Sequence, residues 1–490
     1  MSARKKQSPL SILMVTSEAA PYSKTGGLAD MTGALAKALA ARGNDVTLVT
    51  PLHRQVNRRA AGLRAAGAKS VSIPVSARIE EARLVPAAPL AGARMIFVES
   101  RRYFDREGLY GGRYGDFPDN AERFAFFAQA ALETIPAFKL KPDVIHIHDW
   151  QAALVPVYLS ARRAAPRPPT VLTIHNLGYQ GRFDPRQWHT LGLGWDQFYH
   201  PGALEFYGGI NFLKGGLMFS EALTAVSPTY AREIQTSEYG WGLDGILRGR
   251  EKRLAGVLNG IDTGEWNPAT DVFLPARYTA RDPSGKEACK ARLREELGLE
   301  PGGGPLIAMV SRLVEQKGAD IVLPCVEQFV ELGARFALLG SGHRSLEEAF
   351  SAMAARRPGR VAVRIGYDES LSHRIVAGSD LFVIPSRYEP CGLTQMYSLA
   401  YGTVPVARAT GGLADTVFDV DAAPETGNGF TFAGYSADAL YRRTRDAVEF
   451  WRSNPAGWRT IMERGMKEDH SWGESAMQYE QVYRSAISAP

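Results

Sequence analysis

The sequence has few cysteines, no long apolar run and little excess of charge. Its three cysteines, Cys289, Cys325 and Cys391, lie far apart and form no CxxC pair, which argues against a disulfide framework or a thiolate zinc site. No apolar run approaches the roughly 18 residues that a membrane span requires, and the N-terminus carries no signal-peptide pattern. We therefore expect a cytoplasmic protein in a reducing compartment that does not cross a membrane.

Charges of the two signs nearly balance, with 57 Lys and Arg against 52 Asp and Glu and a net charge of +5. The basic residues do not gather into long blocks, so nucleic acid is not an expected partner. The hydrophobic share of 45% is that of a globular protein, and 490 residues exceed one ordinary core. We expect two large domains, and the oligomeric state stays open.

Apolar segments typical of buried strands alternate with segments of helical period. Residues 11–16 precede a loop, a helix-like segment and then the strand-like residues 45–51, and such strand–helix–strand units build parallel sheets. Further strands are expected at 144–148 and 171–175. A second series with the same alternation begins near residue 304. The pattern predicts an α/β fold of two Rossmann-like domains.

The domain boundary is predicted near residue 260. Residues 258–271 are rich in Gly, Asn, Asp and Pro, and the stretch that follows, up to 302–304, is polar and irregular. We therefore divide the chain into an N-terminal domain, residues 1–260, and a C-terminal domain, residues 261–470.

Two further features bear on this division. TGGLAD occurs at residues 25–30 and again at 410–415, which supports two related halves without proving a duplication. Residues 471–490 carry apolar side chains at helical spacing, which predicts an amphipathic helix that can pack on either half.

The glycine pairs of the two TGGLAD copies join expected strand ends to helix starts. Without a Cβ atom, Gly27 and Gly412 would let backbone N–H groups approach a ligand at the positive end of a helix. An anionic or hydroxyl-rich ligand would suit such a site. The alternative is that the glycines only form tight turns, and Lys24 beside the first pair favours a ligand.

Two cations and a carboxylate follow expected strands of the second half. Arg312 and Lys317 come just past a strand end, where they would converge on phosphate oxygens, although most such side chains are surface charges. Glu389 precedes a helix whose N–H groups at residues 392–394 would also hold phosphate. The alternative for Glu389 is a carboxylate that caps this helix.

Three patterns suggest other chemistry and are set aside. His146, His148 and Asp149 end a strand without a third ligand at metal spacing, so hydrogen-bonding roles are favoured there and at His175. The DxD pattern at 419–421 is interpreted as a solvated loop. No complete dinucleotide fingerprint or phosphate-binding GKS/T loop is present, which excludes dehydrogenases and P-loop enzymes.

A series of motifs resembles the bacterial glycogen synthase and plant starch synthase family, in the family's order and over nearly the whole chain. They are KTGGLAD, HIHDW, THNLGYQG, INFLKGGL, TAVSPTYAREI, LNGID, SRLVEQKG, SRYEPCGLTQ and TGGLADTV. The absence of a transit peptide favours the bacterial branch. The resemblance implies two domains facing across a deep cleft, the first on the acceptor side and the second on the nucleotide-sugar donor side, with helix 471–490 returning to the first.

The resemblance also implies the reaction. A glycosyltransferase of this kind transfers glucose from ADP-glucose to the non-reducing end of an α-1,4-glucan, retaining the anomeric configuration, in glycogen biosynthesis. ADP-glucose is a co-substrate, and no metal or other cofactor is expected. Only the resemblance, and no residue by itself, favours ADP-glucose over UDP-glucose.

Family roles then fall on matching positions. Lys24, Arg312 and Lys317 resemble the cations that hold the donor diphosphate, Glu389 the carboxylate that binds glucose, and His175 the histidine beside the glucosyl group. The remaining residues expected at the donor site are Asp149, Gly27, Gly412, Cys391, Gly392, Leu393 and Thr394. For Cys391, filling space in a tight loop is at least as good an interpretation as a chemical role.

One position departs from the wider superfamily of retaining transferases. A second glutamate is expected eight residues after Glu389, where this chain has Tyr397, so a mechanism with two carboxylates is unsupported. We expect substitution on one face of the sugar, assisted by the leaving diphosphate. Two rivals are a nucleotide-sugar epimerase, which the acceptor-side motifs disfavour, and an inactive glucan-binding scaffold, which the intact set of charged residues disfavours.

Overall fold

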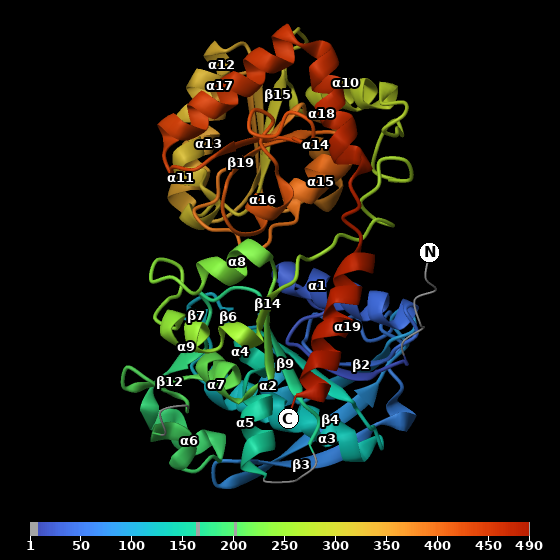
Figure 1. Cartoon of the computed structure of the whole chain (residues 1–490), viewed down its shortest axis with the longest axis vertical. Helices are drawn as coiled ribbons and strands as arrows, with labels where there is room; N and C mark the ends of the chain where they lie inside the picture. Colours follow the sequence, from blue (N-terminus) through green and yellow to red (C-terminus); the bar gives the residue numbers. More distant parts are fainter. Residues whose placement is uncertain (1–7, 163–166, 200–202, 490) are drawn as a thin grey trace. The chain divides into compact units, whose positions relative to one another are not determined.

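The computed structural model describes residues 8–162, 167–199 and 203–489. The N-terminal residues 1–7, which enter the expectation of no signal peptide, lie outside the described part. The chain forms two compact units: unit 1 comprises Met1–Val226, Ala231–Val257 and Trp472–Pro490, and unit 2 comprises Ser227–Tyr230 and Leu258–Ser471. Each unit is built on its own sheet with helices against it (Figure 1).

Unit 1 contains a nine-stranded sheet in the order β14-β13-β9-β8-β1-β2-β5-β4-β3. Its strands run parallel, except that β4 pairs antiparallel with both β5 and β3. Strand β1 has the sequence SILMV and is almost wholly buried, as expected for a parallel strand covered by helices on both faces. The strands are β1 (Ser11–Val15), β2 (Asp45–Pro51), β3 (Lys69–Val75), β4 (Arg78–Pro86), β5 (Arg94–Glu99), β8 (Val144–His148), β9 (Thr170–Ile174), β13 (Ala222–Ala225) and β14 (Leu254–Gly256).

Unit 1 also contains short antiparallel strands, which form a hairpin and a three-stranded sheet. They are β6 (Gly111–Gly112), β7 (Gly115–Asp116), β10 (Arg182–Phe183), β11 (Glu205–Phe206) and β12 (Gly209–Asn211). The helices of this part of the chain are α1 (Gly27–Ala41), α2 (Arg101–Phe104), α3 (Asn120–Ala137), α4 (Asp149–Ala152), α5 (Leu154–Ala161), α6 (Asp196–Tyr199), α7 (Phe212–Phe219), α8 (Pro228–Glu233) and α9 (Asp244–Gly249).

The last helix, α19 (Trp472–Ser488), packs in unit 1 beside α1, although the two are far apart in sequence (Figure 1). Arg42, just past α1, forms a two-pronged ion pair with Glu480 at 2.9 Å. The Tyr483 hydroxyl lies 2.8 Å from Nδ1 of His146 on β8. These contacts fix the end of the chain against the sheet of unit 1.

Unit 2 contains a six-stranded, wholly parallel sheet in the order β17-β16-β15-β18-β19-β20. Along β15, Ile307 and Met309 belong to one apolar core, whereas Leu306 and Ala308 belong to another. Because successive side chains of a strand point to opposite faces, this sheet separates two cores. The strands are β15 (Leu306–Val310), β16 (Arg335–Gly340), β17 (Val361–Ile365), β18 (Leu381–Ile384), β19 (Val404–Arg408) and β20 (Phe430–Phe432).

Helices cover both faces of this second sheet (Figure 1). They are α10 (Ser284–Leu297), α11 (Ala319–Val322), α12 (Cys325–Glu331), α13 (Arg344–Arg356), α14 (Glu369–Gly378), α15 (Thr394–Ala400), α16 (Gly411–Thr416), α17 (Ala437–Ser453) and α18 (Pro455–Lys467). The predicted α/β fold of two Rossmann-like domains is confirmed. Within the described residues, no helix has the length and apolar character needed to span a bilayer.

Each sheet has a point at which the strand order reverses. In unit 1 the first strand, β1, lies between β2 and β8, and in unit 2 the first strand, β15, lies between β16 and β18. Connections leave in opposite directions there, and in open α/β sheets ligands bind beyond the carboxyl ends of the strands at this position. The side chains that follow β1, β8, β15 and β18 are therefore the first place to look for function.

Candidate active site

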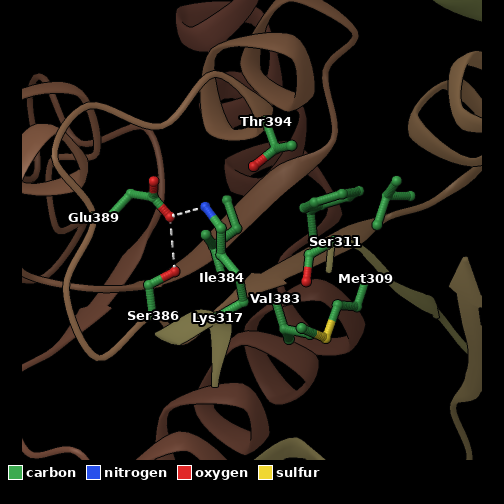
Figure 2. Close-up of a pocket in the computed structure, with 10 residues that line it drawn as sticks. Met309, Ser311, Lys317, Val383, Ile384, Ser386, Glu389 and Thr394 are labelled. Atoms are coloured by element: carbon green, nitrogen blue, oxygen red, sulfur yellow. Dashed lines mark hydrogen bonds and ion pairs between the residues drawn. The ribbon is translucent and has the colours of Figure 1, made fainter. Parts of the chain in front are cut away.

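A pocket of about 140 Å³ lies at the switch point of unit 2 (Figure 2). The ends of β15 and β18 form its apolar floor, and the loops that follow them supply its polar groups. Its lining consists of Met309, Val310, Ser311, Lys317, Phe382, Val383, Ile384, Ser386, Glu389 and Thr394. Three residues predicted from the sequence, Lys317, Glu389 and Thr394, thus come together at one pocket.

An ion pair dominates the chemistry of this pocket. Lys317 Nζ lies 2.6 Å from Glu389 Oε2, and Ser386 Oγ lies 2.9 Å from the same oxygen (Figure 2). The glutamate side chain is 7% exposed and the lysine 22%. Removing two charges from water costs several kcal/mol, which their attraction only partly returns. Both partners of this nearly buried pair line the pocket at the switch point.

The loop that carries Glu389 has a fixed course because two glycines pack beneath it. A Cβ atom at Gly411 would lie 1.9 Å from the Glu389 carbonyl oxygen, and one at Gly412 would lie 2.1 Å from that of Cys391. The Gly412 N–H also donates to the Glu389 carbonyl at 3.0 Å. Gly412 was predicted in the donor pocket, and its contacts here are with the back of the loop.

Cys391 and Gly392 continue this loop. Cys391 is buried, and burial raises the pKa of its thiol to about 12, so the thiol stays protonated and is a poor nucleophile. Of the two interpretations of Cys391, its surroundings favour space filling. Gly392 has φ +72°, a conformation that favours glycine, and Leu393 then precedes α15, whose first residue is Thr394.

Arg312 lies near this pocket in sequence but not in its lining. The residue before it, Ser311, lines the pocket. The Arg312 side chain is exposed and donates to Gln316 Oε1 at 3.2 Å. A role for Arg312 in binding the donor stays a prediction, and its exposure leaves the guanidinium accessible to an incoming phosphate.

A second cluster follows β8 and β9 at the switch-point edge of unit 1. Asp149 is buried, and its Oδ1 accepts the backbone N–H of His175 at 2.7 Å. Its backbone has φ +54°, which a residue with a side chain adopts at some cost and which is frequent at functional sites. Burial raises the pKa of this carboxyl to about 7, against the N–H groups that lower it.

The histidines of this cluster are neutral. His148 Nδ1 lies 3.1 Å from His175 Nε2, and desolvation lowers the pKa of His175 to about 3. His146 uses both ring nitrogens, with Thr173 Oγ1 at 2.6 Å and the Tyr483 hydroxyl at 2.8 Å. His175, which keeps part of its surface exposed, can therefore take part in hydrogen bonds but cannot supply a positive charge near neutral pH.

Lys24 and Gly27 lie at the start of α1 in unit 1. Lys24 is half exposed and forms an ion pair with Asp30 at 2.8 Å. A Cβ atom at Gly26 or Gly27 would meet nothing within 4 Å among the described residues. Packing within the chain therefore does not explain the first glycine pair, in contrast to the second.

Three polar residues of these edges were not singled out from the sequence. Glu18, past the end of β1, accepts hydrogen bonds from Thr25 Oγ1 at 2.6 Å and from the Tyr110 hydroxyl. Its burial outweighs these bonds and raises the pKa of its carboxyl. Glu18 could have been found as a polar residue after a strand, and Ser386 from its place three residues before Glu389. Tyr110 has no such signal, because it comes from a distant loop.

The interpretation of residues 419–421 as a solvated loop is wrong for Asp419. Its side chain is 16% exposed, forms an ion pair with Arg443 at 2.7 Å and accepts the Thr431 N–H at 2.6 Å. Asp421 is 71% exposed and pairs with the same arginine. The DxD pattern therefore ties α17 to the loop before β20. In the described part of the chain, the ligand-type group with spacing suited to a metal is instead Glu265, Glu369 and His373.

Comparisons with known proteins agree with this architecture. Residues 11–249 match the family model of the starch synthase catalytic domain, and residues 292–455 match that of glycosyl transferases group 1. A glycogen synthase of Anaeromyxobacter sp. (strain Fw109-5) is 50% identical, with 98% of this chain and 100% of the relative covered. A glycogen synthase of Myxococcus xanthus is 46% identical at the same coverage.

Solved structures extend the likeness to the whole fold. The catalytic domain of starch synthase IV from Arabidopsis thaliana, bound to ADP and acarbose, matches with a TM-score of 0.90 and 36% identity, covering 98% of this chain and 100% of that one. A sucrose-phosphate synthase from Thermosynechococcus elongatus, 18% identical with a TM-score of 0.61, shares the fold. By its identity to relatives over nearly its full length, the chain belongs to the glycogen synthase family of glycosyltransferases.

Proposed function

We propose that this glycosyltransferase, which transfers glucose from ADP-glucose to an α-1,4-glucan, holds its donor at the Lys317–Glu389 pocket and retains the anomeric configuration. The observation that carries the proposal is the ion pair at 2.6 Å, at the carboxyl ends of the strands where unit 2 reverses its strand order. A diphosphate competes for the ammonium group, and sugar hydroxyls donate to the freed carboxylate.

The size of the pocket limits what enters it. About 140 Å³ holds a phosphate or part of a sugar ring, whereas sites for ligands as large as a nucleotide sugar measure roughly 300–1,000 Å³. The rest of the donor therefore lies over neighbouring groups, of which exposed Arg312 and the N–H groups of residues 392–394 are the candidates. Because α15 has only seven residues, its individual N–H groups matter more than its dipole.

The fixed positive charge serves the transition state. As the bond from the anomeric carbon to the diphosphate oxygen breaks, negative charge grows on the phosphate and positive character on the carbon. Lys317, with Arg312, stabilises the departing diphosphate. The new bond forms between the anomeric carbon and the acceptor hydroxyl oxygen, and the hydroxyl proton passes to the diphosphate that leaves.

Retention without a protein nucleophile agrees with the surroundings of Glu389. A retaining glycosidase places a second carboxylate about 5 Å from the first, but Tyr397 occupies the position eight residues on and stacks on Trp266 with ring centroids 3.7 Å apart. We therefore assign the reaction to substitution on one face. A glucosyl–protein adduct that forms and decays at the rate of turnover would contradict this assignment.

For unit 1 we propose that three predicted residues, His175, Gly27 and Lys24, contact the substrate and that a fourth, Asp149, positions His175. The carbonyl of His175 faces the positive character of the sugar, and its neutral imidazole exchanges hydrogen bonds with a hydroxyl. Asp149 holds the His175 backbone in place through its bond at 2.7 Å. The open space over Gly27 admits part of the donor, and Lys24 contributes charge once it leaves Asp30.

The proposal includes the cytoplasm as the site of this reaction. Glutathione keeps thiols reduced there, and Cys289, Cys325 and Cys391 are all free and buried. The acceptor is an α-glucan chain, the polymer that the family's reaction extends. The bound ADP and acarbose of the Arabidopsis starch synthase, an adenine nucleotide and a sugar-like compound, support this choice of donor and acceptor class.

Labelled donors test the proposal. The purified chain is incubated with glycogen and either ADP-glucose or UDP-glucose carrying radioactive glucose, after chelation and without added metal. We expect label from ADP-glucose in the polymer. The new bonds should be α-1,4 linkages, so that an amylase specific for α-1,4 bonds releases the label. Label recovered as a changed free nucleotide sugar indicates an epimerase, and no conversion of either donor indicates a scaffold. Either result contradicts the proposal, as does a preference for UDP-glucose.

A further inference from the structure

A cluster of metal-ligand type lies in unit 2 outside the lining of the Lys317–Glu389 pocket. Glu369 is the first residue of α14, His373 lies one turn further along the same helix, and Glu265 comes from the loop before α10. One ligand atom from each side chain lies within 4.8 Å of the others. Residues four apart share a face of a helix, so Glu369 and His373 present their side chains together.

Asp271 fixes the tautomer of His373. Its Oδ2 lies 2.7 Å from His373 Nδ1 and also accepts the Tyr401 hydroxyl. A carboxylate only accepts hydrogen bonds, so Nδ1 carries a proton, and in a neutral imidazole Nε2 then holds a lone pair. Histidines that bind metals characteristically donate their second nitrogen to a carboxylate in this way.

The other nitrogen of His373 has no partner within the described residues. The residue is 0% exposed, and its Nε2 forms no hydrogen bond there. Leaving such an atom unsatisfied costs roughly 1–3 kcal/mol. The Asp271 contact fixes which nitrogen faces Asp271, and Trp266, stacked on the ring with centroids 3.7 Å apart, and Phe273, at 4.9 Å, hold the plane of the ring.

The two carboxylates lie beside each other and near the ring of His373. The side chains of Glu265 and Glu369 form a hydrogen bond with each other, and burial together with this neighbour raises the pKa of Glu265. Two acidic groups side by side and an imidazole lone pair make a three-ligand set.

We propose that Glu265, Glu369 and His373 bind one divalent transition-metal ion of the zinc class, with Asp271 as the carboxylate that orients the histidine. Zinc takes nitrogen and carboxylate oxygen at about 2.0–2.2 Å, which places tetrahedral ligand atoms about 3.4 Å apart. The exposed glutamates close the remaining distance, at most about 1.4 Å, by rotation. The imidazole disfavours Mg²⁺ and Ca²⁺, which prefer oxygen ligands.

The ion has a structural effect in this position. It joins the loop of Glu265 to the first turn of α14, and it replaces a carboxyl–carboxylate contact and an unsatisfied nitrogen with bonds to metal. A ligand that binds only the folded chain stabilises it by mass action. The site uses none of the residues assigned to the donor, so it stands or falls separately from the proposed reaction.

The test uses the full-length chain without an affinity tag, freed of metal by a chelator. Competition with a chromogenic zinc chelator should show one high-affinity zinc ion per chain, with the melting temperature raised by zinc and not by Mg²⁺. Glu265→Gln and Glu369→Gln should each weaken zinc binding about tenfold or more. The matched control is Glu348→Gln, an exposed helix glutamate paired with Arg344, which should bind zinc as the wild type does.

Both glutamate variants are used because His373 is buried, so His373→Ala would disturb the fold as well as the site. Circular dichroism of the metal-free variants establishes that they fold. A Co²⁺-loaded chain supplies a second readout, since visible absorption of tetrahedral intensity should appear in the wild type and fade in Glu369→Gln. Absence of a stoichiometric zinc ion, or wild-type affinity in both glutamate variants, overturns the proposal.

Discussion

The two TGGLAD segments have the same six residues and opposite surroundings. At residues 25–30 the glycines begin a helix of 15 residues, and added Cβ atoms would meet open space. At residues 410–415 they begin a helix of six residues, and added Cβ atoms would overlap the Glu389–Cys391 loop. The first segment leaves room above a helix start, whereas the second supports an active-site loop. Identical sequence thus serves two physical purposes.

The aspartates of the two copies differ in the same way. Asp30 pairs with Lys24, half exposed, at 2.8 Å. Asp415 accepts hydrogen bonds from the Thr229 N–H and hydroxyl at 2.8 and 2.7 Å, anchoring residues 227–230 in unit 2. The aspartate of the first copy forms a partly exposed ion pair within unit 1, and that of the second holds residues 227–230 by hydrogen bonds.

The largest effect is expected at residues 410–415, the TGGLAD copy whose glycines are crowded by the Glu389–Cys391 loop. Gly412→Ala places a Cβ atom against the Cys391 backbone, so the loop must shift or unit 2 must strain. We expect the free energy of unfolding to fall by about 3 kcal/mol, because overpacking against backbone is not easily relieved. Urea denaturation measures this change, and turnover should fall with it because Glu389 moves. Wild-type stability would show that the loop is loose.

The next effect concerns the cation that this loop faces. Lys317→Ala should lower turnover by roughly 100-fold or more, since losing one preorganised charge typically costs about 3 kcal/mol at the transition state. Incorporation of labelled glucose into glycogen measures it, with circular dichroism to verify folding. Lys467→Ala is the control, because Lys467 also pairs with a glutamate, at 3.0 Å, but is 60% exposed on α18. Equal rates in the two variants would reject the assignment.

At residues 25–30, the TGGLAD copy whose glycines face open space, the effect should be smaller and confined to binding of the donor. Gly27→Ala meets no atom of the chain, so stability should hold or rise slightly, by up to about 1 kcal/mol. If part of the donor lies over this helix start, KM for ADP-glucose should rise about tenfold, the equivalent of about 1.4 kcal/mol. Steady-state kinetics and thermal melting separate the two. An unchanged KM would remove Gly27 from the donor site.

The last effect is a pH dependence of stability at the edge of unit 1 that carries Asp149. The pKa of Asp149 rises from 3.8 to about 7 on folding, so between these values the folded chain keeps a proton that the unfolded chain has lost. Stability from this group is present at low pH and is lost as pH rises towards 7. The free energy of unfolding of the wild type should therefore fall between about pH 5 and pH 8. In Asp149→Asn this fall should be smaller by about 1–3 kcal/mol. Chemical denaturation at both pH values measures it, and an equal decline in both proteins would contradict it.

Much of the fold can be predicted from the sequence because buried parallel strands are short, mostly apolar runs. Runs such as SILMV and DVTLVTP are apolar on both faces, and the structure has β1 and β2 where they occur. The expected strand at 11–16 is one residue longer than β1 at its end, and the expected strand at 171–175 is shifted by one residue from β9, because pairing fades at strand ends. The fold class and the strand positions can be predicted because they depend on the local pattern of apolar and polar residues.

The sites follow less completely because they depend on contacts between distant segments. Lys317 and Glu389, 72 residues apart, meet because both follow strands that are neighbours in the sheet. The sequence gives no sign that Glu18 meets Tyr110, or that Asp271 faces His373. Nor does it distinguish the open glycine pair, Gly26 and Gly27, from the crowded pair, Gly411 and Gly412, since the obstructing Glu389–Cys391 backbone lies 20 to 23 residues away in sequence.

A double-mutant cycle on the Lys317–Glu389 pair tests the central claim most directly. The wild type, Lys317→Ala, Glu389→Ala and the double variant are compared by kcat/KM for ADP-glucose at saturating glycogen. If the two side chains contact different parts of the donor, the double variant should lose about tenfold or more beyond either single variant. If each side chain only pairs with the other and neither contacts the donor, all three variants will be equally impaired. This result would contradict the assignment of the donor to this pocket.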